Sequence, residues 1–552
     1  MAHELAGTKV QAQDLIDVDA LTKAYYENIP DVSQAAQRVS FGTSGHRGKS
    51  LDSTFTDAHV AAIAQAICDG RKTFGASDIC FVGQDTHALS QAAFKTVQEV
   101  LAGNGVSMAI DANGDFVPTP SVSRAILRYN LESGEGERHA DGIVITPSHN
   151  PPDCGGIKYN PTHGGPAEEA ITKWIEAKAN EYLTNKGQGI KRMALDVIPL
   201  NLRQPYEYKK LYVDELPQII DIEAIRKWNK PVLVNALGGS GMAYWQAIRD
   251  TYGLPLTIIN DTYDPTFSFM SYDHDGKVRM DCSSAYAMAE VTKNMGHYAL
   301  AVGNDPDYDR FGIVTQKGLV EPNHVLAALA MYLFSSRKQW IQKGVGKTIV
   351  GTQMINEICD DFNLPGKDFA IPLYEVPVGF KYFARLLYKQ KVGLAGEESA
   401  GASFLKKDGS TWTTDKDGII VALAAMEMTA VLGRNPQEEY DRLAIQYGKK
   451  YYGRIDTACT REEKAKIKKL RPMDVVAKTV AGDAITDVRN TARYEDLLIG
   501  GLRIDTAKGW VVARPSGTED LYKVYGESKV SQDHLQALLD AGAALIKDAV
   551  NK

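Results

Sequence analysis

The chain has 552 residues, of which 62 are Lys or Arg and 69 are Asp or Glu, so its formal net charge is −7. This balance argues against a general nucleic-acid or membrane-surface binder, and no apolar run approaches the ~20 residues of a membrane span. Hydrophobic content of 44% and charged content of 24% are ordinary for a soluble globular protein, and the length predicts roughly three to four domains.

The six cysteines are scattered, with no CxxC pair and no zinc-type spacing. We expect them to be reduced thiols in a cytoplasmic protein. The N-terminus has no basic region followed by an apolar core, so it does not predict a signal peptide.

Strand-like and helix-like segments alternate through most of the chain. Residues 1–40 are polar and helix-friendly, and we predict an N-terminal arm there. The segments that follow, before residue 200, are a helix at 56–72, a strand at 78–82, a helix at 91–103 and a strand at 142–145. This alternation predicts βαβ units on a parallel sheet.

The alternation restarts twice and then changes character. Strands are predicted at 230–235, 299–302, 347–351 and 392–395. After about residue 435 we predict a charged helix at 462–470, a strand at 509–513 and a closing amphipathic helix at 531–550. The predicted organisation is an arm, three α/β domains and a smaller α+β domain, with bounds 1–40, 41–200, 201–312, 313–435 and 436–552.

A serine on a proline-rich loop follows the apolar strand at 142–145. Ser148 lies in the run Thr146-Pro147-Ser148-His149-Asn150. The carboxyl end of a parallel strand is where open α/β sheets bind ligands, and the prolines stiffen the loop. The alternative is a plain turn, because Ser, Asn and Pro are common turn residues.

Three aspartates follow the strand predicted at 299–302. Asp305, Asp307 and Asp309 occupy every second position, so in extended chain their side chains point the same way. Three hard oxygen ligands suit Mg²⁺, which keeps a position for water or for a phosphate oxygen. A phosphorylated Ser148 could supply that oxygen, and Arg310 could neutralise part of its charge.

Two other kinds of segment can carry aspartates at this spacing. An EF-hand is excluded, because Arg310 and Gln316 stand where that motif requires Gly and Glu. A solvated acidic turn remains an alternative.

Two later loops carry groups suited to a sugar phosphate. Glu397, Glu398 and Ser399 lie between glycines, where their oxygens could bind vicinal hydroxyls; the alternative is a helix N-terminus. The second loop could form a phosphate nest, although an N-cap explains the same residue types; its groups are Arg514, Ser516, Gly517 and Thr518.

An early glycine-rich loop over 41–48 carries Ser44 and Arg47, and it could cradle a phosphate or simply turn. Together with the other four loops, it resembles the α-D-phosphohexomutase superfamily, and within it the bacterial phosphoglucomutases most closely. The resemblance runs in order from about residue 41 to the C-terminus. Five motifs in this order are very specific.

The resemblance implies four domains, each giving one loop to a central cleft, and it implies a role for each loop. Ser148 would be the phosphoserine and would bind Mg²⁺ with Asp305, Asp307 and Asp309. Glu397 and Ser399 would bind the sugar, and the phosphate already on the substrate would be bound by Arg514, Ser516, Gly517 and Thr518. Arg47 and Lys158 would contact the transferring phosphoryl group, with His149, Ser44 and Arg310 nearby.

Two of these positions carry a qualification. Lys158 matches a proposed general acid–base, and it can accept a proton only if its pKa is depressed, which we expect from burial near other cations. The segment 377–381, which contains Gly379, resembles a loop involved in reorientation; Val378 stands where Thr is common, so no hydroxyl contact is expected there.

The implied reaction interconverts glucose 1-phosphate and glucose 6-phosphate through glucose 1,6-bisphosphate. The Gly396-Glu397-Glu398-Ser399 run looks like the glucose-selective form. Alternatives are a sister mutase for mannose or glucosamine phosphates, a serine-dependent metal phosphomonoesterase, and a catalytically silent sugar-phosphate sensor. Related bacterial enzymes also suggest a homodimer.

Overall fold

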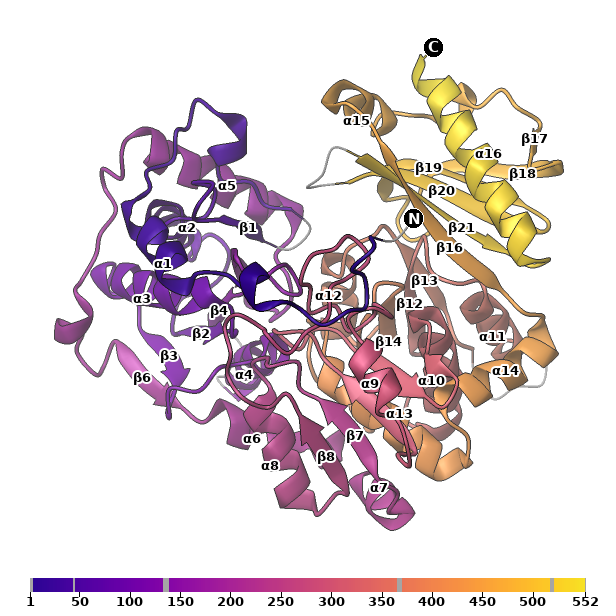
Figure 1. The fold of residues 1–552 in the computed structure, drawn as a ribbon, viewed down its shortest axis with the longest axis horizontal. Coiled ribbons are helices and arrows are strands. Elements are labelled where there is room, and N and C mark those ends of the chain that lie inside the picture. The colour runs from indigo at the N-terminus through magenta and orange to yellow at the C-terminus, as the bar shows by residue number, and fades with distance from the viewer. Residues whose placement is uncertain (1–2, 43–44, 133–138, 365–369, 517–520, 552) are drawn as a thin grey trace. The chain divides into compact units, whose positions relative to one another are not determined.

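The computed structural model describes residues 3–42, 45–132, 139–364, 370–516 and 521–551 (Figure 1). The chain forms two compact units. The first contains residues 1–321, 384–390 and 399–435, and the second contains residues 322–383, 391–398 and 436–552.

The first unit contains a six-stranded mixed sheet in the order β1-β5-β4-β2-β3-β6. The neighbours β4, β2, β3 and β6 pair in parallel, whereas β5 is antiparallel to β4 and to β1. The strands are β1 (His46–Lys49), β2 (Cys80–Gln84), β3 (Met108–Asp111), β4 (Asp141–Ile145), β5 (Cys154–Asn160) and β6 (Arg203–Tyr206).

Two apolar cores involve this sheet. The larger core contains buried side chains of α1, α2, α3 and α5, and the smaller one contains those of α4 and of Tyr208 in α6. The helices are α1 (Val18–Glu27), α2 (Asp57–Gly70), α3 (Ala88–Gly103), α4 (Thr119–Glu132), α5 (Glu169–Thr184) and α6 (Tyr208–Glu215). Leu21, Tyr25 and Val39 are buried in the larger core, so the N-terminal segment contributes apolar packing to this domain.

A five-stranded sheet follows in the first unit, in the order β11-β10-β9-β7-β8. Strand β7 is parallel to its two neighbours β8 and β9, and β10 is antiparallel to β9. Its elements are α7 (Ile222–Trp228), β7 (Val232–Asn235), α8 (Met242–Tyr252), β8 (Leu256–Ile259), α9 (Ala289–Lys293), β9 (Leu300–Gly303), β10 (Gly312–Thr315) and β11 (Gly318–Leu319).

The first unit also includes β15 (Gly401–Phe404) and α13 (Gly418–Leu432). The Asp417 side chain accepts a hydrogen bond from the N–H of Ile420 and so caps the start of α13. Residues Gly418 to Thr429 of this helix are buried, which explains why the segment is apolar on all sides.

The second unit contains three parallel strands in the order β13-β12-β14. The elements of this region are α10 (Pro322–Ser336), β12 (Gly344–Thr348), α11 (Met354–Phe362), β13 (Leu373–Val376), α12 (Lys381–Tyr388), β14 (Val392–Glu397) and α14 (Pro436–Tyr447). Helix α12 crosses the boundary between the two units.

The C-terminal region of the second unit is an antiparallel sheet in the order β16-β21-β20-β19-β18-β17, and α16 packs on β16, β20 and β21 (Figure 1, orange to yellow). Its elements are β16 (Tyr451–Ala458), α15 (Arg461–Ile467), β17 (Thr479–Val480), β18 (Asp483–Thr491), β19 (Leu498–Thr506), β20 (Gly509–Pro515), β21 (Leu521–Ser528) and α16 (Gln532–Asn551). Apolar residues of α15, α16 and the sheet form one core.

The predicted fold class, α/β domains followed by a smaller α+β domain, is confirmed by these sheets. Two predicted strands are displaced, and the strand expected at 78–82 is β2, two residues further along the chain. The strand expected at 347–351 is β12, Gly344–Thr348, and Gly351 N–H donates to the carbonyl of Thr348 in a turn. Ile349 and Val350 are apolar because they are buried in a core with Trp510, and not because they continue the strand.

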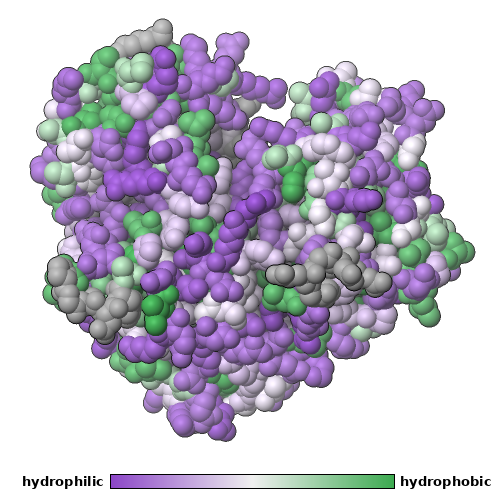
Figure 2. Space-filling view, turned by 180° about the vertical axis from the view of Figure 1, so that it is seen from behind, coloured by the Kyte–Doolittle hydropathy of each residue, from purple (hydrophilic) through white to green (hydrophobic). Residues whose placement is uncertain are grey.

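The face shown in Figure 2 is predominantly hydrophilic, and its apolar residues are dispersed in small patches. No single helix in the described part of the chain is long and apolar enough to cross a membrane. Helices α13 and α14 meet the criterion of length and composition only when they are counted together as a bent pair.

Candidate active site

Ser148 lies on the loop that joins β4 to β5. Its backbone has a left-handed φ of 60°, and its side chain is buried. The hydroxyl donates a 2.8 Å hydrogen bond to Oδ2 of Asp305 and lies 3.2 Å from Nδ1 of His149. The loop can pack closely against β5 because residue 156 is glycine; a Cβ there would lie 2.2 Å from the carbonyl oxygen of Thr146.

The three aspartates of the following domain converge as predicted, but through a different backbone shape. Ligand oxygens of Asp305, Asp307 and Asp309 lie within 4.8 Å of one another, and all three side chains are buried. The segment is not extended, because Tyr308 has a φ of 61° and its N–H donates to the carbonyl of Asp305. A tight turn therefore brings the carboxylates together, and the expected alternation of an extended chain is wrong.

Two buried lysines contact the carboxylates of this cluster. Lys158 Nζ lies 2.5 Å from Asp307 Oδ2 and 3.2 Å from Asp309 Oδ2. Lys416, from the loop before α13, lies 3.0 Å from the same oxygen of Asp309. Thr119 adds a 2.7 Å hydrogen bond to Asp307 Oδ2.

The electrostatics of the cluster fit a divalent cation. Burial raises the pKa of Asp305 well above its usual value, and the charges of Asp307 and Asp309 raise it further. Burial also acts to raise the pKa of Asp309, but Lys158 and Lys416 hold it below its usual value. Oδ1 of Asp307 and Oδ1 of Asp309 are buried and accept no hydrogen bond from the described residues. Hard, anionic oxygens without donors are the ligands that Mg²⁺ prefers.

The pKa of Lys158 moves opposite to the expected direction. Burial does act to lower it, but the carboxylates of Asp307 and Asp309 outweigh burial and raise the pKa above the ordinary value. The expectation of a depressed pKa omitted these two partners. Lys158 is therefore an ammonium in this arrangement.

His149 lies beside the Ser148 hydroxyl, and the N–H of Arg310 donates a hydrogen bond to Asp305. Burial, followed by the charge of Arg310, lowers the pKa of His149 to about 3, and its Nε2 lies 4.0 Å from Oδ2 of Asp281. Arg310 donates from Nη1 to the carbonyl of Ser399 at 3.0 Å. Arg47 donates from Nη1 to Oδ1 of Asn150, at the end of the serine loop, at 3.2 Å.

The predicted sugar-binding residues Glu397 and Gly379 lie together in the second unit. Gly379 N–H donates to Oε1 of Glu397 at 3.0 Å, and its φ of +130° is a conformation that side-chain-bearing residues rarely adopt. The neighbouring Glu398 accepts a 2.9 Å hydrogen bond from Thr348. Ser399 belongs to the first unit, where its carbonyl holds Arg310.

The predicted phosphate-binding loop begins at the end of β20. Arg514 lies in this strand, and Ser516 is buried with its N–H donating to the carbonyl of Leu521. Lys523 is paired directly with Arg514 and with Asp456, so Lys523, Arg514 and Arg454 share one face of the sheet. Gly517 and Thr518, and Ser44 of the early loop, lie outside the described residues.

Sequence reasoning missed three groups in this region: Thr119 and Lys416, which contact the aspartates, and Asp281, which lies near His149. Lys416 had a usable signal, since it stands between Asp415 and Asp417 immediately before an apolar helix. Thr119 and Asp281 are ordinary loop or helix-start residues in the sequence, and only the packing of separate segments brings them to this place.

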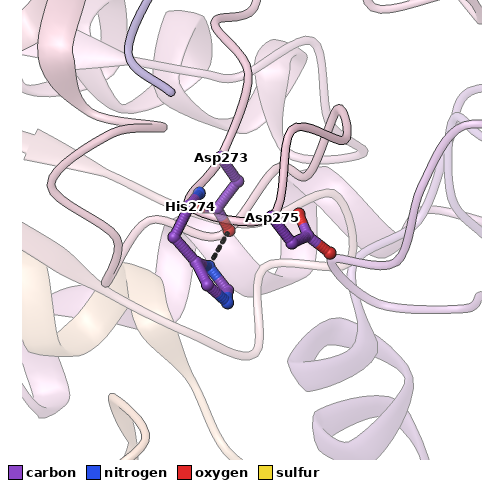
Figure 3. Close-up of side chains that lie close together, drawn as sticks. All are labelled: Asp273, His274 and Asp275. Atoms are coloured by element: carbon purple, nitrogen blue, oxygen red, sulfur yellow. Dashed lines mark hydrogen bonds and ion pairs between the residues drawn. The ribbon is translucent and has the colours of Figure 1, made fainter. Parts of the chain in front are cut away.

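A second group of potential metal ligands, Asp273, His274 and Asp275, lies on a turn in the first unit (Figure 3). His274 Nδ1 is 3.4 Å from Asp273, and Asp275 accepts hydrogen bonds from Arg279. Protein groups thus satisfy these carboxylates, in contrast to the orphaned oxygens of Asp307 and Asp309.

The chain matches four domain models of the phosphoglucomutase/phosphomannomutase family: alpha/beta/alpha domain I at 38–186, domain II at 210–318, domain III at 321–447 and the C-terminal domain at 457–545. It therefore belongs to this family and is an enzyme of the α-D-phosphohexomutase superfamily, as its motifs predicted.

Individual relatives agree with this assignment. A phosphoglucomutase of Komagataeibacter xylinus is 46% identical over 554 residues, covering 99% of this chain and 98% of its own. Phosphoglucomutase 2 of Saccharomyces cerevisiae is 28% identical, covering 77% of this chain and 75% of its own.

Solved structures share the fold. The phosphoglucomutase parafusin from Paramecium has a TM-score of 0.72 at 20% identity, covering 95% of each chain. A putative phosphomannomutase from Thermus thermophilus has a TM-score of 0.70 at 22% identity, covering 92% of this chain and 99% of its own.

Proposed function

We propose that this enzyme interconverts glucose 1-phosphate and glucose 6-phosphate through a phosphorylated Ser148. The hydrogen bond from the Ser148 hydroxyl to Asp305 carries the proposal, because it joins a nucleophile to a cluster of carboxylates suited to a divalent cation. The full-length identity to a phosphoglucomutase supports glucose as the sugar.

Asp305, Asp307 and Asp309 would hold Mg²⁺ together with an oxygen on Ser148. The ion would neutralise charge on the phosphoryl group, which is the main requirement of phosphoryl transfer. Buried acceptors without donors on Asp307 and Asp309 support this ligand set.

In the first half-reaction, the bond between Ser148 Oγ and phosphorus breaks and a bond from the sugar 6-hydroxyl oxygen to phosphorus forms. The hydroxyl proton must pass to a base, and Ser148 regains a proton when its oxygen leaves. The second half-reaction returns the 1-phosphate to Ser148 and releases glucose 6-phosphate. Arg47 and Arg310 would balance the charge of the transferring group.

One group beside the aspartates and one beside Ser148 can handle these protons. Lys158 Nζ carries a proton while Asp307 and Asp309 hold it, so it serves as a donor until those contacts loosen. His149 Nδ1 lies 3.2 Å from the serine oxygen, and its lowered pKa makes it neutral near pH 7. We retain both as candidates for the general acid–base.

Substrate binding is proposed for residues of two further loops. Arg514, Ser516, Gly517 and Thr518 would hold the phosphate that is not transferred, whichever end of the sugar carries it. Glu397, Ser399 and Gly379 would bind and orient the sugar hydroxyls. Glucose 1,6-bisphosphate would turn over between the two half-reactions without leaving the enzyme.

The six cysteines are all free thiols in the structure, which supports a reducing, cytoplasmic location. We also propose a homodimer on the strength of the family resemblance. Light scattering coupled to size-exclusion chromatography would measure its mass directly.

The test is phosphorus NMR of glucose 1-phosphate with the enzyme, Mg²⁺ and a trace of glucose 1,6-bisphosphate. We expect glucose 6-phosphate without free phosphate. Release of inorganic phosphate would instead identify a phosphomonoesterase. Turnover of mannose or glucosamine phosphates alone would identify a sister mutase, and binding without turnover of any of them would identify a sensor.

A further inference from the structure

The backbone at Ser148 requires support from outside its own loop. A left-handed φ at a residue other than glycine is unfavourable, and the structure around it must over-determine the conformation. The loop must also direct the hydroxyl at Asp305, 157 positions further along the chain. Both ends of the loop are held by Asp85 and His87, two residues that follow the neighbouring strand β2.

The first end of the loop is held by Asp85, which directly follows β2. Its Oδ2 accepts a 2.6 Å hydrogen bond from the Thr146 hydroxyl. The oxygen of that hydroxyl in turn accepts a 2.7 Å hydrogen bond from the N–H of Ser148. All three side chains are buried, so solvent does not compete for these bonds.

The second end of the loop is held by His87. Its Nε2 lies 3.0 Å from the carbonyl oxygen of Asn150, and its Nδ1 lies 2.8 Å from Oδ2 of Asp85. Both partners are acceptors only, so both ring nitrogens must donate and the ring is a buried imidazolium. Burial acts to lower the pKa of His87, but the Asp85 carboxylate raises it above the usual value.

Asp85 is itself fixed in place. Its Oδ1 accepts a 2.6 Å hydrogen bond from the Ser90 hydroxyl and a 3.0 Å bond from the N–H of His87. Ser90 lies in the first turn of α3, so the carboxylate is anchored to a helix and a strand end. A rigid ion pair thus spans the serine loop from Thr146 to Asn150.

We propose that Asp85 and His87 are positioning residues for the phosphoryl-carrying Ser148. They contact neither substrate nor the transferring group, and they act by fixing the two ends of its loop. This inference rests on the proposed function. A misplacement of about 1 Å at a reacting group can slow chemistry roughly 100-fold, so loss of the clamp acts on turnover more than on substrate affinity.

The sharpest test is the pair of variants Thr146→Val and Thr146→Ser. Valine keeps the shape but removes the hydroxyl that links Asp85 to Ser148, whereas serine keeps the hydroxyl. We expect Thr146→Val to lower kcat about 10- to 100-fold with KM for glucose 1-phosphate unchanged within about 2-fold, and Thr146→Ser to lie within about 3-fold of the wild type. Intact-mass measurement should show equally slowed phosphorylation of Ser148 by glucose 1,6-bisphosphate.

A second variant and a matched control separate positioning from stability. His87→Gln removes the charge and can bridge only one of the two acceptors, so we expect the same kcat loss. Asp141 begins β4, the strand that leads to the serine loop, and forms another buried ion pair with Arg71. Asp141→Asn should lower the melting temperature and leave kcat near the wild-type value.

Each other outcome overturns the inference. The Asp85–His87 pair would be only a structural ion pair if kcat were normal in Thr146→Val. The same conclusion would follow if Thr146→Val and Thr146→Ser lost kcat equally, or if Asp141→Asn showed an equal loss of kcat. If His87→Gln does not fold, the two Thr146 variants decide. Wild-type enzyme without turnover would overturn the proposed function as well, whereas normal turnover in every variant would overturn only this inference.

Discussion

Ser148 and Asp305 belong to different domains of the first unit, and the serine hydroxyl donates a 2.8 Å hydrogen bond to the aspartate. The contact places the only strained loop residue of the Thr146–Asn150 stretch against the acidic cluster. Replacement of Ser148 is therefore the most direct test of the proposed phosphoserine.

Ser148→Ala should abolish the mutase reaction while sugar-phosphate binding survives. The variant cannot carry the phosphoryl group, so we expect kcat to fall roughly 10⁴-fold or more. Turnover is measured with a coupled assay for glucose 6-phosphate, and binding by calorimetry with glucose 1-phosphate. Near-normal turnover would place the nucleophile elsewhere.

Removal of the divalent cation should stop turnover, and Asp307→Asn should reproduce this loss. Three carboxylates converge on one point, and charge stabilisation by a bound ion is worth several kcal/mol, so we expect a loss of about 1000-fold. The measurement is activity after EDTA treatment and after readdition of Mg²⁺. Asp275→Asn, in the partnered cluster of Figure 3, is the control and should leave activity unchanged. Full activity in EDTA would contradict the assignment.

Arg514→Ala should weaken both substrates. The arginine would hold the phosphate that is not transferred, and this phosphate is at position 1 in one half-reaction and at position 6 in the other. Loss of charge-assisted hydrogen bonds should raise KM roughly 10- to 100-fold for glucose 1-phosphate and for glucose 6-phosphate. Lys508→Ala, on the same domain, serves as the control. An effect confined to one isomer would contradict this role.

Acidification should destabilise the domain that carries Ser148, through His46. This side chain is buried; its Nε2 lies 2.9 Å from the carbonyl of Thr54 and its Nδ1 accepts from the N–H of Ser40, which is the neutral form. Burial, with the neighbouring His59, lowers its pKa from 6.5 to about 4. Because the unfolded chain binds the proton more tightly, the stability is present above pH 6.5 and is lost as the pH falls toward 4.

The His46 contribution amounts to roughly 3 kcal/mol over that range. Guanidinium unfolding at pH 7 and at pH 4.5 measures it. In His46→Gln the free energy of unfolding should fall less between these two pH values than in the wild type. An identical pH dependence in both proteins would show that His46 is not responsible.

Local patterns in the sequence predicted many of the helices and strands and most of the candidate site residues. Apolar runs of four or five residues predicted β4, β7 and β9, because each is buried in the middle of a sheet. Loops after these strands carry the polar residues, since strand ends are where a packed sheet leaves room for a ligand. Ser148 and the three aspartates were found in this way.

The local sequence pattern did not predict the backbone conformation of the loop that carries Asp305, Asp307 and Asp309. Alternate spacing suggested an extended chain, whereas a left-handed Tyr308 turns the backbone and gathers the carboxylates. Tyr308 adopts this conformation while its ring is buried against Gly239 and Gly241 of another loop. Such a preference comes from packing and not from the residues of the loop itself.

The sequence by itself determined the order of the domains, the family and the loops that carry the candidate site residues, because each depends on residues close together in the chain. Tertiary structure alone decided which charges meet. Lys158 and Asp307 are 149 positions apart, and their contact reverses the direction in which burial would move the lysine pKa. Asp85 and Thr146, 61 positions apart, meet because β2 and β4 are neighbours in the sheet. Electrostatic energies depend on the distance between charges and on their burial, and neither can be predicted from the residues that are neighbours in the sequence.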